Sequence, residues 1–513
     1  MKRKNTTIQA VCITILLLLT IGTTITTTGT TPEKQTKCIA ELRNPSKPMQ
    51  LPSPDLITPN IPATQTTQPL PAYIITDLSE ATDPLGVNIS EACGINNKGE
   101  IVGYEDFGYF MTRTIYWSPD GTASLLDTLP GRNSSRPYMI DDNGLILGWS
   151  GIVWYEWIGE FQKLHMNQTA VIWEDQEIQN LNDHVTGGDT LDLYHTRDNN
   201  NAGTIVGSGA PFGNIPPPWW PNGFILDNGT ITDLGTATYP YAINNQGDIA
   251  GWIEADFTHA HVWEDGIPID LNDDPIIKAN YSQAYDINDH GLITGMAQYD
   301  YSLYWEPTVW KNHQAIRLLP TTSQYAGYAI AVNENDQVIG YYDDLLTGAW
   351  YAFLWEDNQI IYLNDYLAGS GFEWIYPEDI NDKGQIVGLG YKTDVGFRAF
   401  LLTPAIPEFE MTIQDGKGIT ALINNTGYAP ATNITWSITV DGGLIFKGKE
   451  TTGEINTLDI GDTSTITASP KGIGLGLFLP LPSITINLTC AEGVSLSKTI
   501  QAKIFFSRIT IQK

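Results

Sequence analysis

A nine-residue phrase recurs seven times in this chain of 513 residues. Its general form is Ile-Asn-x-x-Gly-x-Ile-x-Gly, and the copies begin at residues 95, 140, 199, 243, 287, 332 and 380. The intervals lie in the forties except for one of 59 residues. A period of this length, built from strand-like pieces, is typical of propeller blades. The repeat therefore predicts a ring or stack of similar β units.

Each copy continues in a similar way, with a variable loop, an aromatic strand, a tight turn and a final strand. Two examples are "HAHVWEDGIPIDLND" at 259–273 and "YAFLWEDNQIIYLND" at 351–365. Alternating polarity with Asn, Asp and Gly at the turns predicts four short antiparallel strands per repeat. No long segment shows apolar spacing at 3.6 residues, so we expect an all-β chain.

The last repeat indicates how the ring closes. It ends with "RAFLLTPA" at 398–405 and lacks a fourth strand, whereas "YIITDLS" at 73–79 matches the fourth strand "TITDLGT" at 230–236. We expect this early strand to complete the last blade, because closure removes exposed sheet edges. The prediction is a seven-bladed β-propeller over residues 72–405.

The motifs "AINNQGDIAGW", "HAHVWEDG" and "IDLND" resemble the HAF repeat, which is named for a His-Ala-Phe triplet. Related triplets stand at 259–261, 351–353 and 398–400, while "GFILDNG" and "TVWKNHQ" in the third and fifth copies depart from the pattern. The resemblance covers about two thirds of the chain and implies an extracellular β-propeller. It brings no established activity and no catalytic residues.

The charge balance is 27 basic against 58 acidic residues, a net of −31. Proteins that bind nucleic acid concentrate Lys and Arg, so we exclude nucleic acid as a partner. No pair among Cys12, Cys38, Cys93 and Cys490 has metal-ligand spacing, and at most one disulfide is plausible among the last three. We predict no metal and no cofactor.

The chain opens with three cations followed by an apolar stretch from about Ile8 to Ile25, the pattern of an export signal. Residues 1–28 are read as a signal peptide or an N-terminal membrane anchor, and both alternatives stay open because the stretch is near the lower spanning limit. Residues 29–71 are Thr- and Pro-rich and predict an extended linker. We therefore expect an extracellular or cell-surface protein that meets the membrane only through an uncleaved leader.

Sequons of the form Asn-x-Ser/Thr are candidate N-glycosylation sites in an exported chain. They stand at Asn88, Asn133, Asn167, Asn228, Asn280, Asn424, Asn433 and Asn487.

The repeated phrase superficially matches a calcium-binding loop. However, His290 and Lys383 occupy the fifth position of its two strongest copies, and no Glu closes either window. We interpret the phrase as a turn in which Asn and Asp bond the local backbone and Gly supplies positive φ. A recurrent Trp is likewise assigned to the core: Trp117, Trp173, Trp263, Trp355 and either Trp305 or Trp310.

Binding is expected on the long connections between the second and third strands, since variable loops on a rigid ring usually carry function. These are residues 104–113, 149–168, 208–222, 296–307 and 341–350. Their aromatic and acidic residues suit sugars, although the Trp side chains could instead pack as a lid over the ring. The candidate ligand-binding residues are Trp154, Trp157, Trp219, Trp220, Tyr299, Tyr301, Tyr341 and Tyr342.

Residues 406–513 do not contain the repeat. Their alternating pattern predicts about seven short strands, which is typical of an immunoglobulin-like β-sandwich. The segment resembles CARDB-type adhesion modules, through an Asn-x-Gly turn before a small-residue bend in "NNTGYAPATNI" and a later "L-x-x-G-x-S" motif. The resemblance implies a spacer or attachment module.

The leading functional hypothesis is an exported, non-catalytic binding or adhesion protein for an extracellular glycan or protein ligand. One alternative is a polysaccharide-cleaving hydrolase or lyase at the mouth of the ring, where a carboxylate pair would be required. The acids on the chosen loops include Glu105, Asp300, Asp343 and Asp344. A structural surface-layer component is the other alternative.

Overall fold

A computed structural model describes most of the chain beyond the predicted leader and linker, both of which lie outside the described residues. The described ranges are 72–81, 89–107, 111–158, 161–186, 191–211, 220–273, 281–299, 304–319, 325–393, 395–414, 416–476 and 481–511. They contain strands and short 3-10 turns, and none of their helices is long and apolar enough to cross a membrane. The all-β prediction is confirmed.

Seven four-stranded antiparallel sheets follow one another through residues 72–405, numbered here sheet 1 to sheet 7. Sheet 1 has β2 (Ile89–Ile95), β3 (Ile101–Asp106), β4 (Thr112–Trp117) and β5 (Ala123–Leu125). Sheet 2 has β6 (Ser134–Ile140), β7 (Ile146–Ile158), β8 (Phe161–Glu174) and β9 (Glu177–Asn180). Sheet 3 has β10 (Leu191–Asn199), β11 (Ile205–Pro211), β12 (Asn222–Asp227) and β13 (Thr230–Thr236).

The later sheets repeat this order. Sheet 4 has β14 (Thr238–Ile243), β15 (Ile249–Glu254), β16 (Thr258–Glu264) and β17 (Ile267–Asp270). Sheet 5 has β18 (Ser282–Ile287), β19 (Leu292–Ala297), β20 (Glu306–Lys311) and β21 (Gln314–Arg317). Sheet 6 has β22 (Tyr325–Val332), β23 (Val338–Asp344), β24 (Ala349–Glu356) and β25 (Gln359–Tyr362). Sheet 7 has β26 (Trp374–Ile380), β27 (Ile386–Lys392), β28 (Gly396–Ala405) and β1 (Ala72–Asp77).

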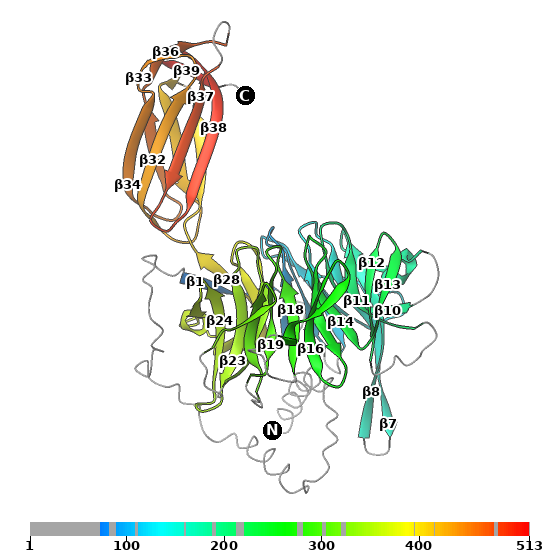
Figure 1. The fold of residues 1–513 in the computed structure, drawn as a ribbon. Coiled ribbons are helices and arrows are strands. Elements are labelled where there is room, and N and C mark those ends of the chain that lie inside the picture. The colour runs from blue at the N-terminus through cyan, green and yellow to red at the C-terminus, as the bar shows by residue number, and fades with distance from the viewer. Residues whose placement is uncertain are drawn as a thin grey trace. The chain divides into compact units, whose positions relative to one another are not determined.

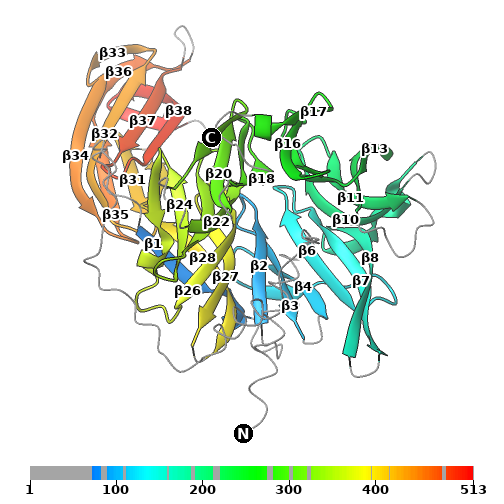
Figure 2. The same ribbon diagram turned by 60° about the horizontal axis from the view of Figure 1, so that its bottom comes forward.

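Sheet 7 joins the two ends of this region. Strand β1 pairs antiparallel with β28, from Ala72 opposite Ala405 to Asp77 opposite Phe400, and Figures 1 and 2 both show the blue β1 beside the yellow β28. The Asp77 carboxylate also lies 2.6 Å from Lys392 Nζ and 3.3 Å from Arg398 Nε. The predicted pairing of these two strands is confirmed.

Each copy of the repeated phrase forms the turn between the first two strands of its sheet. In the third copy, Asn200 Oδ1 accepts hydrogen bonds from the backbone N–H groups of Ala202 and Thr204, both at 3.1 Å. Gly203 follows with a φ of 83°, a conformation that glycine adopts without steric cost. The predicted turn role of the phrase is confirmed.

The same asparagines also join neighbouring sheets, a role that the sequence pattern did not predict. Each Nδ2 donates to a carbonyl oxygen of the next sheet at 2.9–3.2 Å, and the bond from Asn381 to Asn96 joins sheet 7 to sheet 1. We call this set the asparagine ring: Asn96, Asn200, Asn244, Asn288, Asn333 and Asn381. Sheet 2 has Asp141 at this position. Its side chain cannot make the corresponding bond, because a carboxylate cannot donate a hydrogen bond.

The recurrent Trp packs in the core, as predicted. Trp117, Trp173, Trp263 and Trp310 are buried among the apolar side chains that fill the space between sheets, and Trp355 is half-buried. The fifth copy therefore uses Trp310. The Trp117 indole also donates to the Leu78 carbonyl at 3.1 Å, which ties the chain just after β1 to sheet 1.

The prediction that residues 149–168 form a loop is wrong. Strands β7 and β8 continue as a long hairpin that pairs as far as Ile158 opposite Phe161, and Figure 1 shows it projecting beyond the neighbouring strands. Its β-branched and aromatic residues favour strands, and pairing satisfies the backbone polar groups of both arms. The added length accounts for the 59-residue interval in the repeat.

The C-terminal unit contains two sheets around one core. The smaller sheet has β29 (Phe409–Gln414), β31 (Ile419–Asn425) and β35 (Thr463–Ala468). The larger has β30 (Gly416–Lys417), β39 (Arg508–Ile511), β38 (Ser495–Phe506), β37 (Ser483–Thr489), β32 (Ala431–Asp441) and β34 (Glu450–Leu458), with β33 (Leu444–Lys447) paired to β36 (Lys471–Gly474). Both sheets contribute to the core, including Ile423 from the first and Ile438 and Ile486 from the second.

Three half-buried aspartates, Asp198, Asp286 and Asp379, should make the stability of the ring depend on pH. Burial raises the pKa of Asp198 to about 7, of Asp286 to about 8 and of Asp379 to about 6, although backbone N–H donors oppose each shift. Each carboxylate accepts from the backbone of the next sheet at 2.8 Å. Because these pKa values lie above the ordinary 3.8, the folded state binds more protons than the unfolded state between these limits.

We therefore expect the melting temperature to fall as the pH rises from about 5 to about 8.5. The melting temperature is measured in high salt, because salt screens the repulsion among surface charges but hardly affects enclosed groups. The Asp198→Asn variant should show a weaker pH dependence than the wild type, whatever its absolute stability. An identical slope in the two proteins would contradict this assignment.

Candidate functional site

The first strands of the seven sheets surround the axis of the ring. Strands β2, β6, β10, β14, β18, β22 and β26 contact one another in order, and β26 contacts β2. Each carries a β-bulge, which re-aims a side chain. The bulged residues three positions before the Asn or Asp of each repeated phrase are Cys93, Tyr138, Arg197, Tyr241, Tyr285, Ile330 and Glu378.

These side chains converge on the axis from all sides. Arg197 of sheet 3 lies over the rings of Tyr138 of sheet 2 and Tyr241 of sheet 4. Burial raises the pKa of Tyr241, and the charges acting on it include Arg197 and, from across the ring, Glu378 of sheet 7. All seven are half-buried, so protein surrounds them but they keep some exposed surface. We call them, together with Glu91, Arg136 and His195, the axial cluster.

Aromatic rings line the axis through sheets 4 to 7. Successive ring centroids lie 4.0–6.2 Å apart in the order Tyr239, Trp252, Tyr285, Tyr328, Tyr341, Trp350 and Tyr376. We call this row the aromatic belt. All its members are half-buried. Aromatic faces with accessible hydroxyl groups suit a ligand that has both apolar faces and hydrogen-bonding edges.

Sheets 1, 2 and 7 contribute a charged sector. Glu91 forms a salt bridge with Arg136 at 3.2 Å and accepts a hydrogen bond from the Tyr104 hydroxyl, and Arg136 lies 4.1 Å from the Tyr104 ring centroid. Burial raises the pKa of Glu378 to about 8, and the nearby Glu91 adds to the shift. Glu378 is therefore largely protonated at neutral pH.

Two further titratable side chains of the axial cluster are neutral at neutral pH. Burial, followed by the charge of Arg197, lowers the pKa of His195 to about 3. The His195 Nε2 lies 2.9 Å from Gln168 Oε1. Burial also raises the pKa of the Cys93 thiol well above its ordinary value, and the structure records this cysteine as free.

The sequence-predicted ligand-binding residues that the structure describes lie in different surroundings. Trp220 and Trp154 are about half exposed, and Trp154 stacks on His165 with ring centroids 5.0 Å apart. Tyr341 belongs to the aromatic belt. Trp219, Tyr301 and the side chain of Trp157 lie outside the described residues, as does Asp300.

Two tyrosines predicted to lie on accessible loops are buried, so that part of the prediction is wrong. Tyr299 is 2% exposed, and its hydroxyl lies 2.9 Å from Thr308 Oγ1 beneath the Arg317 guanidinium. Tyr342 is 5% exposed and contacts other aromatic rings, including Tyr325. Tyr342 lies on β23, where strand alternation directs it to the face opposite that of Tyr341, whereas Tyr299 lies just after the end of β19.

Of the acids proposed for catalysis, Glu105 is buried on β3 rather than accessible, and Asp343 and Asp344 lie where β23, the second strand of sheet 6, ends. Asp344 Oδ1 accepts from the backbone N–H of Leu346 in the following turn. The described members of this set therefore do not form a carboxylate pair at the axis.

The residues of the axial cluster were missed because their signal is a register position rather than a motif. Seven of them stand three residues before the Asn or Asp of each phrase, where Tyr, Arg, Glu or Cys replaces the apolar residue expected of a core strand in every copy except the sixth. Glu91, Arg136 and His195 stand two residues earlier in their copies. Reading these positions across the seven copies would have identified them.

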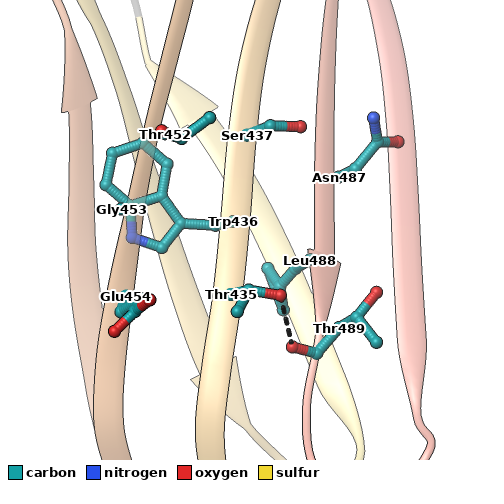
Figure 3. A pocket seen from close by; sticks show the side chains of 9 residues that line it. All are labelled: Thr435, Trp436, Ser437, Thr452, Gly453, Glu454, Asn487, Leu488 and Thr489. Atoms are coloured by element: carbon teal, nitrogen blue, oxygen red, sulfur yellow. Dashed lines mark hydrogen bonds between the residues drawn. The ribbon is translucent and has the colours of Figure 1, made fainter.

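Two concavities lie away from the axis. One, of about 390 Å³ on the C-terminal unit, is lined by Thr, Ser and Asn side chains around Trp436 (Figure 3). A Cβ on Gly453 would lie 2.3 Å from the Trp436 ring, so this ring already occupies the space that a larger side chain would need. The other, of about 210 Å³, lies beside His290 and His313, each paired with an acid.

The predictions on metal binding and glycosylation stay predictions. Among the described residues, no cluster of His, Cys, Asp and Glu is placed to hold a metal ion. Asn133, Asn167, Asn228, Asn433 and Asn487 are exposed, Asn424 is half-buried, and Asn88 and Asn280 lie outside the described residues. Exposure permits modification of the first five but does not establish it.

No protein-family model and no curated protein matches the chain. Among solved structures, a puromycin hydrolase mutant complexed with PGG is 10% identical with a TM-score of 0.42, covering 65% of this chain and 58% of that one. A streptogramin B lyase is 11% identical with a TM-score of 0.36, covering 65% and 98%. A sialidase from Trypanosoma rangeli in complex with sialic acid is 11% identical with a TM-score of 0.28, covering 83% and 87%. These similarities to propeller-type proteins provide no argument about activity.

Proposed function

We propose that this chain is an exported, non-catalytic binding protein that holds an extracellular saccharide at the axis of a seven-bladed β-propeller formed by residues 72–405. Residues 406–513 act as an immunoglobulin-like spacer or attachment module at the cell surface. The resemblance of the repeats to HAF sequences and of the C-terminal segment to CARDB modules supports this extracellular role.

The aromatic belt is the observation that carries the proposal. Its seven rings form a continuous half-buried surface on a rigid ring of strands. Sugars stack their C–H faces on such rings while their hydroxyl groups bond polar tips such as tyrosine hydroxyls. The exposed Trp154 and Trp220 would contact more distant parts of a longer glycan.

A glycan array with a parallel peptide panel tests the proposal on the purified chain. The Trp252→Ala variant should bind a recognised saccharide at least roughly tenfold more weakly, because an aromatic contact is lost from the belt. Phe257→Ala is the matched control, since Phe257 is an exposed aromatic residue of the same region that contacts Tyr281 instead. Folding of both variants is checked by thermal melting.

Each other outcome argues against a specific part of the proposal. Binding that is lost in Trp220→Ala or Trp154→Ala but kept in Trp252→Ala would move the site to these exposed rings. Binding of peptides without any saccharide would contradict the ligand class.

Polysaccharide cleavage at the axis is the second candidate, and one observation favours it. Glu378 is kept protonated close to Glu91, and such a pair of differently charged carboxyl groups is what acid catalysis of glycoside cleavage requires. Release of reducing ends by the wild type but not by Glu378→Gln would favour this enzyme over a binding protein.

A further inference from the structure

Three other enclosed arginines have a carboxylate partner, whereas Arg197 has none among the described residues. Arg136 pairs with Glu91 at 3.2 Å, Arg317 with Glu306, and Arg398 with Asp77 at 3.3 Å. Arg197 makes no hydrogen bond or ion pair with any described residue, although the chain contains 58 acidic residues. An enclosed charge without a partner is costly, which points to a role outside folding.

The surrounding structure holds the Arg197 guanidinium in place. Its Cζ lies 4.4 Å from the ring centroid of Tyr138 and 4.7 Å from that of Tyr241, the tyrosines of the adjoining sheets. Cation–π contacts use the faces of the guanidinium and leave its N–H edges available. Arg197 also stands on a β-bulge of β10, which fixes the direction of its side chain.

No other described member of the axial cluster compensates the charge of Arg197. The Glu91 charge is taken up by Arg136, and Glu378, His195 and Cys93 are neutral at neutral pH for the reasons given above. Within the axial cluster, Arg197 is therefore the one charged group without a charged partner among the described residues, in a chain of net charge −31. Since the overall charge repels anions, a site for an anion in this protein needs such a local cation.

We propose that Arg197 binds the carboxylate of an acidic saccharide, so that the axial site selects uronic acids over the corresponding neutral sugars. This inference rests on the proposed saccharide-binding function and adds the ligand's charge to it. A planar guanidinium donates two parallel hydrogen bonds to a carboxylate, and the aromatic belt beside it offers rings for the sugar to stack on. The ligand would thus contact both Arg197 and the aromatic belt.

Matched pairs of oligosaccharides test this selectivity on the full chain by calorimetry. Galacturonate against galactose oligomers, glucuronate against glucose and mannuronate against mannose differ only at C6. We expect at least one acidic oligomer to bind the wild type roughly tenfold or more tightly than its neutral counterpart, as expected for a charge-assisted bidentate contact. High salt should reduce the preference.

Three variants locate the effect. Arg197→Gln should abolish the preference for acidic oligomers. Arg197→Lys should keep only part of it, because a compact ammonium group replaces the planar guanidinium and its two parallel donors. Lys311→Gln is the control, because it removes a half-exposed cation paired with Asp336 and should leave the preference unchanged. Melting temperatures confirm that each variant is folded.

The outcomes separate this inference from the proposed function. Equal binding of acidic and neutral oligomers, or a preference that survives in Arg197→Gln, would overturn the inference and leave saccharide binding intact. Absence of binding to every oligosaccharide in the array and the matched pairs would overturn both.

Discussion

A chain that begins at residue 82 is expected to lose the stable fold of residues 89–405, whereas a chain that begins at residue 72 is expected to keep it. The difference between the two is β1 and the short turn after it, which supply the outer strand of sheet 7. Without β1, the long edge of β28 is exposed and Tyr73 and Leu78 leave the core. Open edges of this kind favour aggregation.

The ion pairs of β1 add to this effect. Asp77 faces Arg398, whose side chain is 7% exposed, and Lys392, whose side chain is 16% exposed. Removing β1 breaks both of these ion pairs, and loss of one partner of an enclosed ion pair costs about 3–5 kcal/mol by itself. Together with the lost strand pairing, this is a large part of the stability of an ordinary domain, about 5–15 kcal/mol.

Size-exclusion chromatography and urea denaturation of the two chains measure the loss. A synthetic peptide of residues 72–81 added to the shorter chain should restore part of the stability, because it can pair with β28. Equal stability of the two chains would mean that the hydrogen bonds between sheets close the ring without β1.

The architecture could be predicted because the same strand and turn pattern recurs in seven copies of the repeat. One copy of the phrase is compatible with many turns, but seven copies at similar spacing fix the number of sheets and their order. The missing strand after Ala405 and the surplus strand at Tyr73 then leave one simple way to close the ring.

The axial cluster could not be predicted by the same reasoning. Alternation in a regular strand assigns Tyr138 and Arg197 to a face only if every residue advances the strand by one position. A β-bulge adds a residue and reverses the face of those that follow. The candidate residues were therefore placed on the long connections, where Trp154 and Trp220 are indeed exposed, and the inner strands were overlooked.

The enlarged hairpin of sheet 2 shows a different kind of error. The long interval between two copies of the repeat predicts a loop over residues 149–168, although "GIVWYEWI" has a composition that favours strands. Length alone does not distinguish a loop from two longer strands, because pairing depends on whether both arms can satisfy each other's backbone groups.

Replacing Asn200 with Ala is expected to destabilise the ring by about 2–4 kcal/mol, because one buried and two partly buried hydrogen bonds depend on this side chain. Its Oδ1 accepts from two backbone N–H groups of its own turn, and its Nδ2 donates to the Asn244 carbonyl of the next sheet at 3.2 Å. The Ala variant would leave these groups without partners in a site where the Asn is 7% exposed.

Two further variants divide this loss between the turn and the contact between sheets. Asn200→Asp keeps an acceptor for the turn but cannot donate to Asn244, so it should cost less than Asn200→Ala while still destabilising the ring. Asn201→Ala is the control, because Asn201 is exposed and contacts Asn245 through its backbone N–H. Urea denaturation followed by Trp fluorescence gives the midpoints. If Asn200→Asp matches the wild type, the bond between sheets contributes nothing measurable, and the asparagine ring serves only to build six separate turns.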